Sequence, residues 1–432
     1  MSSGQGHAGE NDTMSVPIKT LFLAPQVPWP LDVGSKIRTY NLLMSYAELG
    51  PVTLVCYAQD ENDAAAVDSL RASVASIEVI PLGAMPGAPG LFAQAVHRWP
   101  RVIRFFSRAA FTRAVSALAT MQHFDVVHVE RLFMAEGIAG LGRGGSLLRV
   151  LDVDDLESAK ARRDLAALSW WKLRKWLGAL DVIKLRRYES HILRDLDQAL
   201  VCSDLDRTAV APRMGRGEAV TFRNGADFDA TVRPATDDGR TLLFFGALDY
   251  GPNVDAALFL VREIWPRIRA ALPEARLKIA GKSPCAEVRA LGNGDDVELM
   301  GYVNDKAELF ASVTAAVVPI RSGGGTRIKI LEAMAMGKAV ISTRIGCEGI
   351  DATHGESILL GDSAEEFAQA CLRALGDAPL REKLSANGRE LVRRHYAWPA
   401  IRRSFSAKVR ETVNRRRSPA AQFAGAAALP VR

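Results

Sequence analysis

Cysteine is scarce in this sequence, and long hydrophobic runs are missing. Only five of the 432 residues are cysteine, and none forms a Cys-x-x-Cys pair or lies at metal-ligand spacing from a histidine. We therefore expect neither a disulfide framework nor a structural zinc site. No stretch of about eighteen apolar residues occurs, and the segment before residue 16 has no apolar run, so we predict no transmembrane span and no export signal. The expected location is cytoplasmic.

The sequence also has little excess of one sign of charge. The 55 basic and 49 acidic residues leave a formal charge of +6, far less than a dedicated nucleic-acid-binding protein usually carries. We expect no nucleic acid partner, although the small excess fits an anionic ligand. The composition, 48% apolar and 24% charged, is typical of packed globular domains. At roughly 150 residues per domain, the length predicts two or three of them.

Short apolar runs alternate with longer segments of helical periodicity, and this pattern occurs twice. It is typical of parallel sheets covered by helices. The first set of predicted strands is TLFLA, VTLVCY, IEVIPL, FDVVHVE, LRVLDV and ALVCS, and the second is TLLFFGAL, ARLKIAGK, VELMGYV, AAVVPI, KAVIST and SILLG. The sequence therefore predicts two doubly wound, Rossmann-like α/β domains. Such sheets bind ligands at the carboxyl ends of their strands, so we expect an interdomain cleft.

The domain limits follow from turn-rich and small-residue stretches. We predict a disordered segment over residues 1–16, domains over 17–224 and 225–412, and a mobile basic tail over 413–432. A hinge is expected near residues 224–240. The last predicted helix, WPAIRRSFSAKVRET, is either ordinary surface of the second domain or a segment that crosses back to the first.

Three glycines join a predicted strand to a predicted helix in the segment AAVVPIRSGGGTRIKILEAMAMGKAVIST. Gly323, Gly324 and Gly325 permit a tight turn and leave backbone N–H groups unobstructed. The helix expected from about Thr326 adds the partial positive charge of its N-terminus. The segment therefore predicts an anion-binding site.

Three charged side chains follow this turn. Arg327 offers a bidentate fork and Lys329 a point charge, which together suit a diphosphate. Glu332 lies on the same helical face as Lys329, where its carboxylate can accept two sugar hydroxyls. The alternative is an ordinary glycine-containing connection with a Lys329–Glu332 surface ion pair, which contributes only about 0.3–0.5 kcal/mol.

Two common nucleotide motifs are absent. The GKS triplet that begins at Gly281 has Arg276 where a P-loop requires a glycine. The chain also has no G-x-G-x-x-G fingerprint, which argues against an ordinary NAD enzyme. The glycine turn therefore needs another explanation.

From about residue 18 to 412 the chain resembles the family 4 glycosyltransferases of GT-B fold. The segments that carry the resemblance are PWPLDVGSKIRTYNLL, FDVVHVE, FRNGADF, FFGALDYGPNVDAALFL and GGGTRIKILEAMAMGKAVI. That family transfers a sugar from a nucleotide donor with retention and without a required metal or other cofactor. The resemblance implies that the second domain holds the donor and the first the acceptor.

Residue roles implied by the resemblance differ in part from the family pattern. Glu332 matches the second of two family glutamates, the one expected on the donor ribose, whereas Gly324 occupies the position of the first. The turn GALDYGPN has neither the arginine nor the lysine usual there, so we assign diphosphate neutralisation to Arg327 and Lys329. Gly34 matches the family's glycine loop, and the helix that contains Arg38 is expected to face the donor phosphates.

His128, in FDVVHVE, is expected at the carboxyl end of a strand, where its side chain would reach the cleft and take part in catalysis. A buried histidine without a catalytic role is the alternative. The family often has a histidine two positions later, where this sequence has Glu130, so either residue is a candidate.

Asp152 and Asp154 form an Asp-x-Asp triplet, a spacing with which metal-dependent GT-A enzymes hold a divalent ion. The twin-domain pattern instead favours an acceptor-side role or capping of the following helix by Asp154 or Asp155. We expect no metal site.

Two basic, aromatic segments, residues 97–115 and 169–187, suggest contact with an anionic membrane surface. Core helices with solvated basic faces are the equally weighted alternative. Both segments lie in the predicted acceptor domain, which suits a lipid-linked acceptor.

The sequence therefore predicts a retaining glycosyltransferase that moves a sugar from a nucleotide-diphosphate donor to a glycan or lipid-linked hydroxyl. The resemblance implies cell-surface polysaccharide assembly, with the protein cytoplasmic or peripheral on the inner face of the membrane. Two alternatives remain open: a GT-B nucleotide-sugar epimerase or hydrolase, and a non-catalytic partner subunit.

Overall fold

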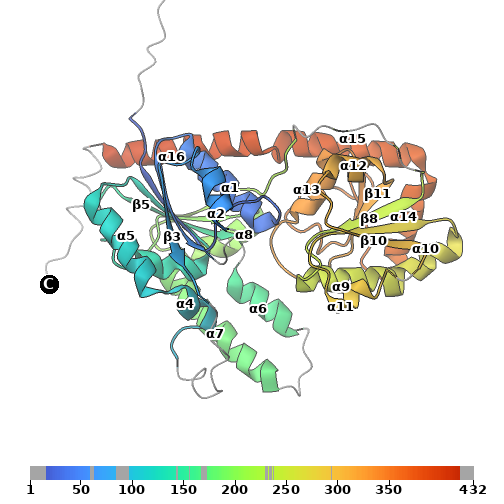
Figure 1. Cartoon of the computed structure of the whole chain (residues 1–432), viewed down its shortest axis with the longest axis horizontal. Helices are drawn as coiled ribbons and strands as arrows, with labels where there is room; N and C mark the ends of the chain where they lie inside the picture. The colour runs from blue at the N-terminus through green and yellow to red at the C-terminus, as the bar shows by residue number, and fades with distance from the viewer. Residues whose placement is uncertain are drawn as a thin grey trace, which may run out of the picture.

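The structure, a computed structural model, describes residues 16–58, 63–83, 97–142, 145–154, 156–166, 173–228, 232, 236, 238–292 and 294–418. It contains two separate α/β domains, each built on one parallel sheet (Figure 1). The predicted fold class is confirmed. The segment over residues 1–15 and the tail beyond 418 lie outside the described residues.

The first domain is built on a seven-stranded sheet in the order β3-β2-β1-β4-β5-β6-β7. Its strands are β1 (Thr20–Ala24), β2 (Val52–Ala58), β3 (Ser76–Pro81), β4 (Val126–Glu130), β5 (Leu148–Asp154), β6 (Gln198–Val201) and β7 (Glu218–Thr221). Its helices are α1 (Gly34–Ala47), α2 (Asp63–Leu70), α4 (Arg101–Phe106), α5 (Ala109–Met121), α6 (Glu157–Ala166), α7 (Leu173–Leu193) and α8 (Asp204–Val210), with short 3₁₀ turns at Leu132–Ile138 and Ala211–Arg213.

The second domain is built on a six-stranded sheet in the order β10-β9-β8-β11-β12-β13. Its strands are β8 (Thr241–Phe245), β9 (Arg276–Ala280), β10 (Val297–Gly301), β11 (Ala315–Val318), β12 (Ala339–Ser342) and β13 (Leu359–Leu360). Its helices are α9 (Gly251–Phe259), continued by a π-turn over Leu260–Ile264, then α10 (Trp265–Ala271), α11 (Ala286–Arg289), α12 (Lys306–Ala311), α13 (Ile328–Ala335), α14 (Ala364–Gly376) and α15 (Ala378–His395).

Each strand order reverses beside the first strand of its domain. In the first sheet β1 pairs in parallel with β2 on one side and β4 on the other, and in the second β8 pairs with β9 and β11. The connections leave such a strand pair in opposite directions and open a crevice at the carboxyl ends. The fold therefore puts the segments after β1, β8 and β11 at candidate ligand sites.

The last helix, α16 (Trp398–Arg417), crosses back from the second domain to the first (Figure 1). There it packs against α1, and the Ser406 hydroxyl donates to the carbonyl of Ser45 at 2.9 Å. Of the two alternatives for this segment, crossing back is the one observed.

The prediction of a mobile tail from residue 413 is wrong for its first five residues. Val413 is fully buried, Arg416 pairs with Asp197 at 2.5 Å, and Arg417 pairs with Asp125 at 2.7 Å. The basic residues looked like a solvated tail because their carboxylate partners are some two hundred to three hundred residues away in sequence.

Candidate functional site

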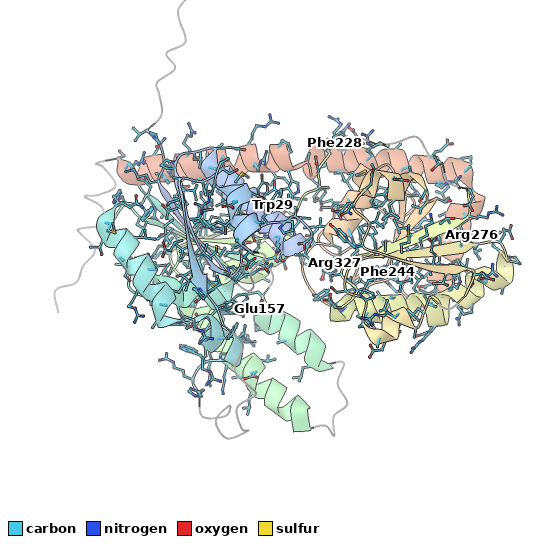
Figure 2. All side chains as sticks on the ribbon, viewed as in Figure 1. Trp29, Glu157, Phe228, Phe244, Arg276 and Arg327 are labelled. Atoms are coloured by element: carbon cyan, nitrogen blue, oxygen red, sulfur yellow. The ribbon has the colours of Figure 1, made fainter. Side chains whose placement is uncertain are left out.

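A cavity of about 690 Å³ lies between the two domains and is lined by both. It includes Pro25 after β1, Gly246 after β8 and Ile320 after β11, so it coincides with the points where the strand orders reverse. Figure 2 shows Arg327 on the side of the second domain that faces the first, with Glu157 across the gap. The predicted interdomain cleft is present.

The three glycines form the predicted turn between β11 and α13. Gly323 and Gly325 have φ values of 102° and 71°, which glycine adopts far more readily than other residues. Helix α13 begins at Ile328, two residues later than expected, and Gly323, Gly324, Gly325 and Thr326 all line the cavity. The structure thus brings together the residues of the predicted anion site.

Arg327 folds back onto this turn. Its Nη1 donates to the carbonyl oxygens of Gly324 and Gly325, while the side chain still lines the cavity. The guanidinium therefore fixes the shape of the turn as well as contributing positive charge beside it.

Lys329 lies beside the turn after β8, a turn whose own sequence has no lysine or arginine. Its Nζ donates to Oδ1 of Asn253 at 2.8 Å and stands 4.9 Å from the centre of the Phe244 ring. A methyl group on Gly246 would come within 2.7 Å of this Nζ. Helix α13 therefore delivers a lysine to the turn GALDYGPN, whose own sequence contains neither lysine nor arginine.

The environment of Lys329 destabilises its charged form relative to the same side chain in water. Burial, and then the neighbouring charge of Arg327, lower its pKa to about 7, with Glu332 opposing the shift. An anion bound in the cavity would restore the positive form, because an opposite charge at close range favours the ammonium ion.

Glu332 lines the same cavity but does not form the surface pair with Lys329 that the alternative interpretation required. Its Oε1 accepts from Nζ of Lys306 at 2.6 Å, and Lys306 begins helix α12. The carboxylate is therefore held at the cavity wall by a cation from another element.

Gly34 begins helix α1 and lines the cavity. A methyl group on Gly34 would lie 3.3 Å from the side chain of Ile328, so the N-termini of α1 and α13 meet here. The glycine is placed as predicted.

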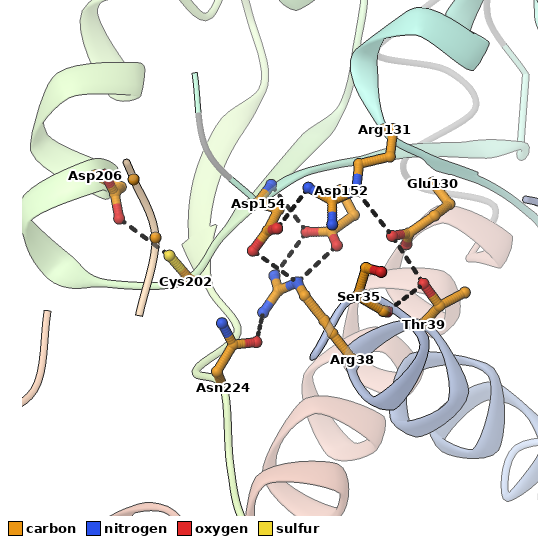
Figure 3. A network of polar contacts seen from close by, with 12 residues as sticks. Ser35, Arg38, Thr39, Glu130, Arg131, Asp152, Asp154, Cys202, Asp206 and Asn224 are labelled. Atoms are coloured by element: carbon orange, nitrogen blue, oxygen red, sulfur yellow. Dashed lines mark hydrogen bonds and ion pairs between the residues drawn. The ribbon is translucent and has the colours of Figure 1, made fainter. Parts of the chain in front are cut away.

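Arg38 is placed differently from the prediction, because its guanidinium is committed inside the first domain (Figure 3). It forms a bidentate pair with Asp152 at 2.7 and 2.6 Å and donates to the Phe222 carbonyl and to Asn224 Oδ1. Only 1% of Arg38 is exposed. The side chain reaches the cavity edge, but its geometry is that of a structural ion pair.

The Asp-x-Asp triplet is occupied by arginines. Asp152 pairs with Arg38, and Asp154 pairs with Nη1 of Arg131 at 2.5 Å. Burial raises the pKa of Asp152, and Arg38 opposes that shift. Among the described residues, no group of three or more metal-ligating side chains is assembled at this triplet or elsewhere.

Arg131 and Asp154 both line the cavity. The sequence pattern did not single out Arg131, whereas Asp154 belongs to the Asp-x-Asp triplet, for which an acceptor-side role or helix capping was expected. Their φ values of 72° and 54° are unusual for residues other than glycine. Their place in the sequence could have indicated a site, because each lies at or just after the end of a strand.

His128 does not reach the cleft, which corrects the predicted catalytic placement. It is completely buried, stacks on Phe22 with ring centres 4.3 Å apart, and its Nδ1 lies 3.1 Å from the Tyr46 hydroxyl. Strand β4 continues to Glu130, so the histidine lies two residues inside the sheet. Glu130, the other candidate, is also buried and accepts from Thr39 at 2.9 Å.

In the first basic, aromatic segment Trp99 and Phe106 pack against other aromatic side chains of the first domain. Trp99 contacts Tyr188 with ring centres 4.8 Å apart, and Phe106 stacks on Phe133 at 4.5 Å. The alternative of core helices fits residues 97–115 better than a membrane-facing aromatic surface.

The second segment falls partly outside the described residues, because nothing is described of 167–172 or of the side chains of 173–177. In the described part of α7, Leu180 and Ile183 are 45% and 50% exposed. Figure 1 shows α6 and α7 extending away from the body of the first domain. No described helix combines the length and apolar character needed to cross a membrane.

Residues 239–377 match the family model described as Glycosyl transferases group 1. This range contains β8, the glycine turn, Lys329 and Glu332. The second domain is therefore similar to the group 1 glycosyltransferases. The predicted resemblance to glycosyltransferases is thereby confirmed.

Among curated proteins, the chain is similar to the phosphatidyl-myo-inositol mannosyltransferase of Mycobacterium tuberculosis, with 29% identity over 241 residues. The match spans 51% of this chain and 62% of that enzyme. A second relative, an uncharacterized 44.6 kDa protein in the cps region of Klebsiella pneumoniae, is 22% identical over 163 residues.

Solved structures extend the likeness to the whole fold. Sucrose-phosphate synthase from Thermosynechococcus elongatus superposes with a TM-score of 0.68 at 18% identity, covering 92% of this chain and 100% of that one. Anabaena HepE in complex with UDP and glucose gives 0.64 at 15% identity, covering 91% and 99%. Both domains and their arrangement are therefore those of the GT-B fold.

Proposed function

We propose that this protein transfers a sugar from a nucleotide-diphosphate donor to a hydroxyl of a glycan or lipid-linked acceptor, with retention at the anomeric carbon. The observation that carries the proposal is the Lys329–Asn253 contact at 2.8 Å. It places a cation from α13 on the turn after β8, within the same cavity as the glycine turn. The family of the second domain supports the reaction class.

The donor diphosphate is assigned to the space between Lys329 and the glycine turn. Backbone N–H groups of the turn, the N-terminus of α13 and the Lys329 ammonium all favour negative charge there. Glu332, fixed by Lys306, is assigned to the donor ribose. The crystal structure of Anabaena HepE, which shares the fold, contains bound UDP and glucose.

Catalysis is then mainly positional and electrostatic. Charge develops on the departing diphosphate as the bond to the sugar breaks, and Lys329 and the turn stabilise it. The acceptor hydroxyl attacks from the same face, and a phosphate oxygen of the leaving group accepts its proton. The positive charge that the chain itself provides makes a metal ion unnecessary in this proposal.

An acceptor at a membrane surface is supported by two observations. The mycobacterial relative is, by its name, a phosphatidyl-myo-inositol mannosyltransferase, and α7 exposes Leu180 and Ile183 on an extension of the first domain. We place the protein on the cytoplasmic face of the membrane, in assembly of a cell-surface glycan.

Gly324 favours a second candidate, a non-catalytic partner subunit. The family glutamate expected at that position would contact the donor sugar, and a glycine offers no side chain for that contact. Such a subunit would bind nucleotide without turnover. A GT-B epimerase or hydrolase would instead consume the nucleotide sugar at full rate without any acceptor.

Nucleotide binding and transfer separate these candidates. Thermal unfolding of the full chain is measured with UDP, GDP and their sugar conjugates, with and without manganese, and transfer is then measured to a membrane lipid fraction. The variant Arg327→Ala/Lys329→Ala should lose donor binding. The control Arg344→Ala/Lys383→Ala removes two exposed cations, paired with Asp362 and Glu356, and should retain it.

Unchanged donor affinity in the Arg327→Ala/Lys329→Ala variant would refute the proposed diphosphate site. Nucleotide binding without transfer or hydrolysis would indicate the partner subunit. Strong manganese dependence would return the Asp152–Asp154 triplet to consideration as a metal site.

A further inference from the structure

We infer that the first-domain wall of the cavity binds a neutral pyranose ring of the acceptor, with Phe106 and Phe133 as a stacking platform and Arg131 and Asp154 as its hydroxyl-binding edge. The inference rests on the proposed function and names the acceptor chemistry at the same site.

The platform is a preformed aromatic pair. Phe106 ends α4 and Phe133 follows β4, and their rings are stacked with centres 4.5 Å apart at 30°. Both side chains are half-buried and both line the cavity. The Tyr57 hydroxyl donates to the Phe106 carbonyl at 2.7 Å, which fixes the backbone behind the pair.

Half-buried aromatic rings in a cavity provide apolar area for a ligand. Because their side chains are already held in place, little side-chain entropy is lost when a ligand binds. The C–H face of a pyranose ring is apolar, whereas its edge carries hydroxyl groups. Burying that face on the part of the stacked pair that is open to the cavity removes apolar surface from water. A sugar ring therefore suits a cavity wall that has aromatic side chains beside charged ones.

The charged part comes from the same segment of chain. Arg131 precedes Phe133 by two residues, and its Nη1 pairs with Asp154 at 2.5 Å while its Nε lies 3.5 Å from Glu130. Arg131 and Asp154 each retain 16% side-chain exposure at the cavity. The pair presents both a donor and an acceptor to a hydroxyl group, in an orientation set by buried Glu130.

The two walls of the cavity carry opposite charge. The charged lining residues of the second domain are four cations and one carboxylate: Lys282, Lys306, Arg327, Lys329 and Glu332. Those of the first domain are three carboxylates and two guanidinium groups: Asp32, Asp154, Glu157, Arg38 and Arg131. Several of these groups are already paired: Arg38 with buried Asp152, Arg131 with Asp154, and Asp32 with Lys282 of the opposite wall.

This contrast decides what kind of acceptor fits. A diphosphate is attracted to the second-domain wall, whereas a phosphorylated sugar on the platform would meet an Arg131 already paired with Asp154 and, in addition, the carboxylate of Glu157. Like charges repel each other in a partly desolvated site. The group that stacks on Phe106 and Phe133 is therefore uncharged, and any phosphate of a lipid carrier lies outside this part of the cavity.

The test measures sugar binding independently of turnover. Saturation-transfer NMR is recorded on the full chain with saturating UDP and either methyl pyranosides of gluco, galacto and manno configuration or the corresponding sugar 6-phosphates. The wild type should transfer saturation to ring C–H protons of at least one neutral pyranoside, and its affinity should be at least fivefold lower for the 6-phosphate.

Phe133→Leu should weaken pyranoside binding at least fivefold and leave UDP affinity within twofold. Asp154→Asn should reduce the discrimination against the 6-phosphate. The control Phe228→Leu changes a second-domain phenylalanine that packs against Arg389 (Figure 2) and is not among the cavity-lining residues, so it should change neither affinity.

Equal pyranoside binding in wild type and Phe133→Leu, or a preference for the 6-phosphate, would overturn the inference. Failure of the proposed function gives a different result. In that case UDP produces no stabilisation and no nucleotide sugar is consumed, whatever the pyranosides do.

Discussion

The Lys329 ammonium donates to Asn253 Oδ1 at 2.8 Å, although the two residues are 76 positions apart in the chain. Asn253 lies in the first turn of α9, the helix after β8, and Lys329 lies in α13, the helix after β11. The contact brings the segments that follow two separate strands together at one place in the cavity, with Lys329 as the cation. Burial and the neighbouring Arg327 lower the pKa of this lysine to about 7, so its side chain loses its charge as the pH rises through neutrality.

Nucleotide affinity should therefore depend on pH. Below about pH 7 the free protein already carries the ammonium, and the full attraction to a diphosphate is present. Above it, binding must take up a proton, so affinity should fall by up to about tenfold per pH unit until the raised pKa of the complex is passed. Calorimetric titration with UDP from about pH 7 to 9, in two buffers of different ionisation enthalpy, measures affinity and proton uptake.

Lys329→Arg is the matched variant, because a guanidinium stays charged throughout this range. Its UDP affinity should not change with pH, and it should show no proton uptake. A wild-type affinity that is constant from about pH 7 to 9 would contradict the assignment of Lys329 to the diphosphate.

The Arg38–Asp152 pair should be a major source of stability in the first domain. Asp152→Asn leaves the 1%-exposed Arg38 without its carboxylate, and removing one partner of a buried pair typically costs about 3–5 kcal/mol. Urea unfolding of the variant should show a loss of this size. Replacing both partners, as Arg38→Met/Asp152→Leu, should recover much of it.

The exposed Arg71–Asp68 pair, with side chains 68% and 72% exposed, is the control. Asp68→Asn should change the free energy of unfolding by no more than about 1 kcal/mol. If Asp152→Asn behaved like Asp68→Asn, Arg38 would be free for the donor role that the sequence suggested.

The two-domain fold was predictable because its strands are mostly continuous apolar runs. Strand β7 was missed, since only Val220 of Glu218–Thr221 is buried and the run is four residues long. His128 was misplaced because periodicity marks a strand without locating its end, and two residues decide whether a side chain meets the cleft or the core. The Lys329–Asn253 contact depends on how β8 and β11 pair, which no local pattern specifies.

The glycine turn should be sensitive at Gly325. Its φ of 71° costs a residue with a Cβ about 1–2 kcal/mol, whereas the nearest atom to an added methyl, Cys202 Sγ, is at an ordinary 3.8 Å. Gly325→Ala should therefore lower stability by about that amount through backbone strain, and UDP affinity should fall because the turn moves. Thermal unfolding with and without UDP measures both effects.

Gly376→Ala provides the comparison, because Gly376 ends helix α14 and an added methyl would meet nothing within 4 Å. Alanine there should be neutral or stabilising by up to about 1 kcal/mol. Equal effects of the two substitutions would mean that the turn relaxes without strain.

The end of α16 should stabilise the first domain through Arg417. Its guanidinium pairs with Asp125 at 2.7 Å and donates to the Pro17 carbonyl at 3.0 Å. Asp125 is only 4% exposed and also accepts the backbone N–H of Lys19, so it cannot turn to water when the cation is removed. Hydrogen bonds to charged groups contribute about 1.5–3 kcal/mol, and Arg417→Ala should lower the free energy of unfolding by about this amount in urea.

Arg415→Ala is the matched substitution two residues earlier in the same helix. Arg415 is 72% exposed and pairs with Glu411, itself 70% exposed, so its loss should stay within about 0.5 kcal/mol. If the two variants were equally stable, residues from 413 onward would behave as the mobile tail that the sequence predicted. A loss of stability in Arg417→Ala but not in Arg415→Ala would show that the last turn of α16 contributes to the stability of the first domain.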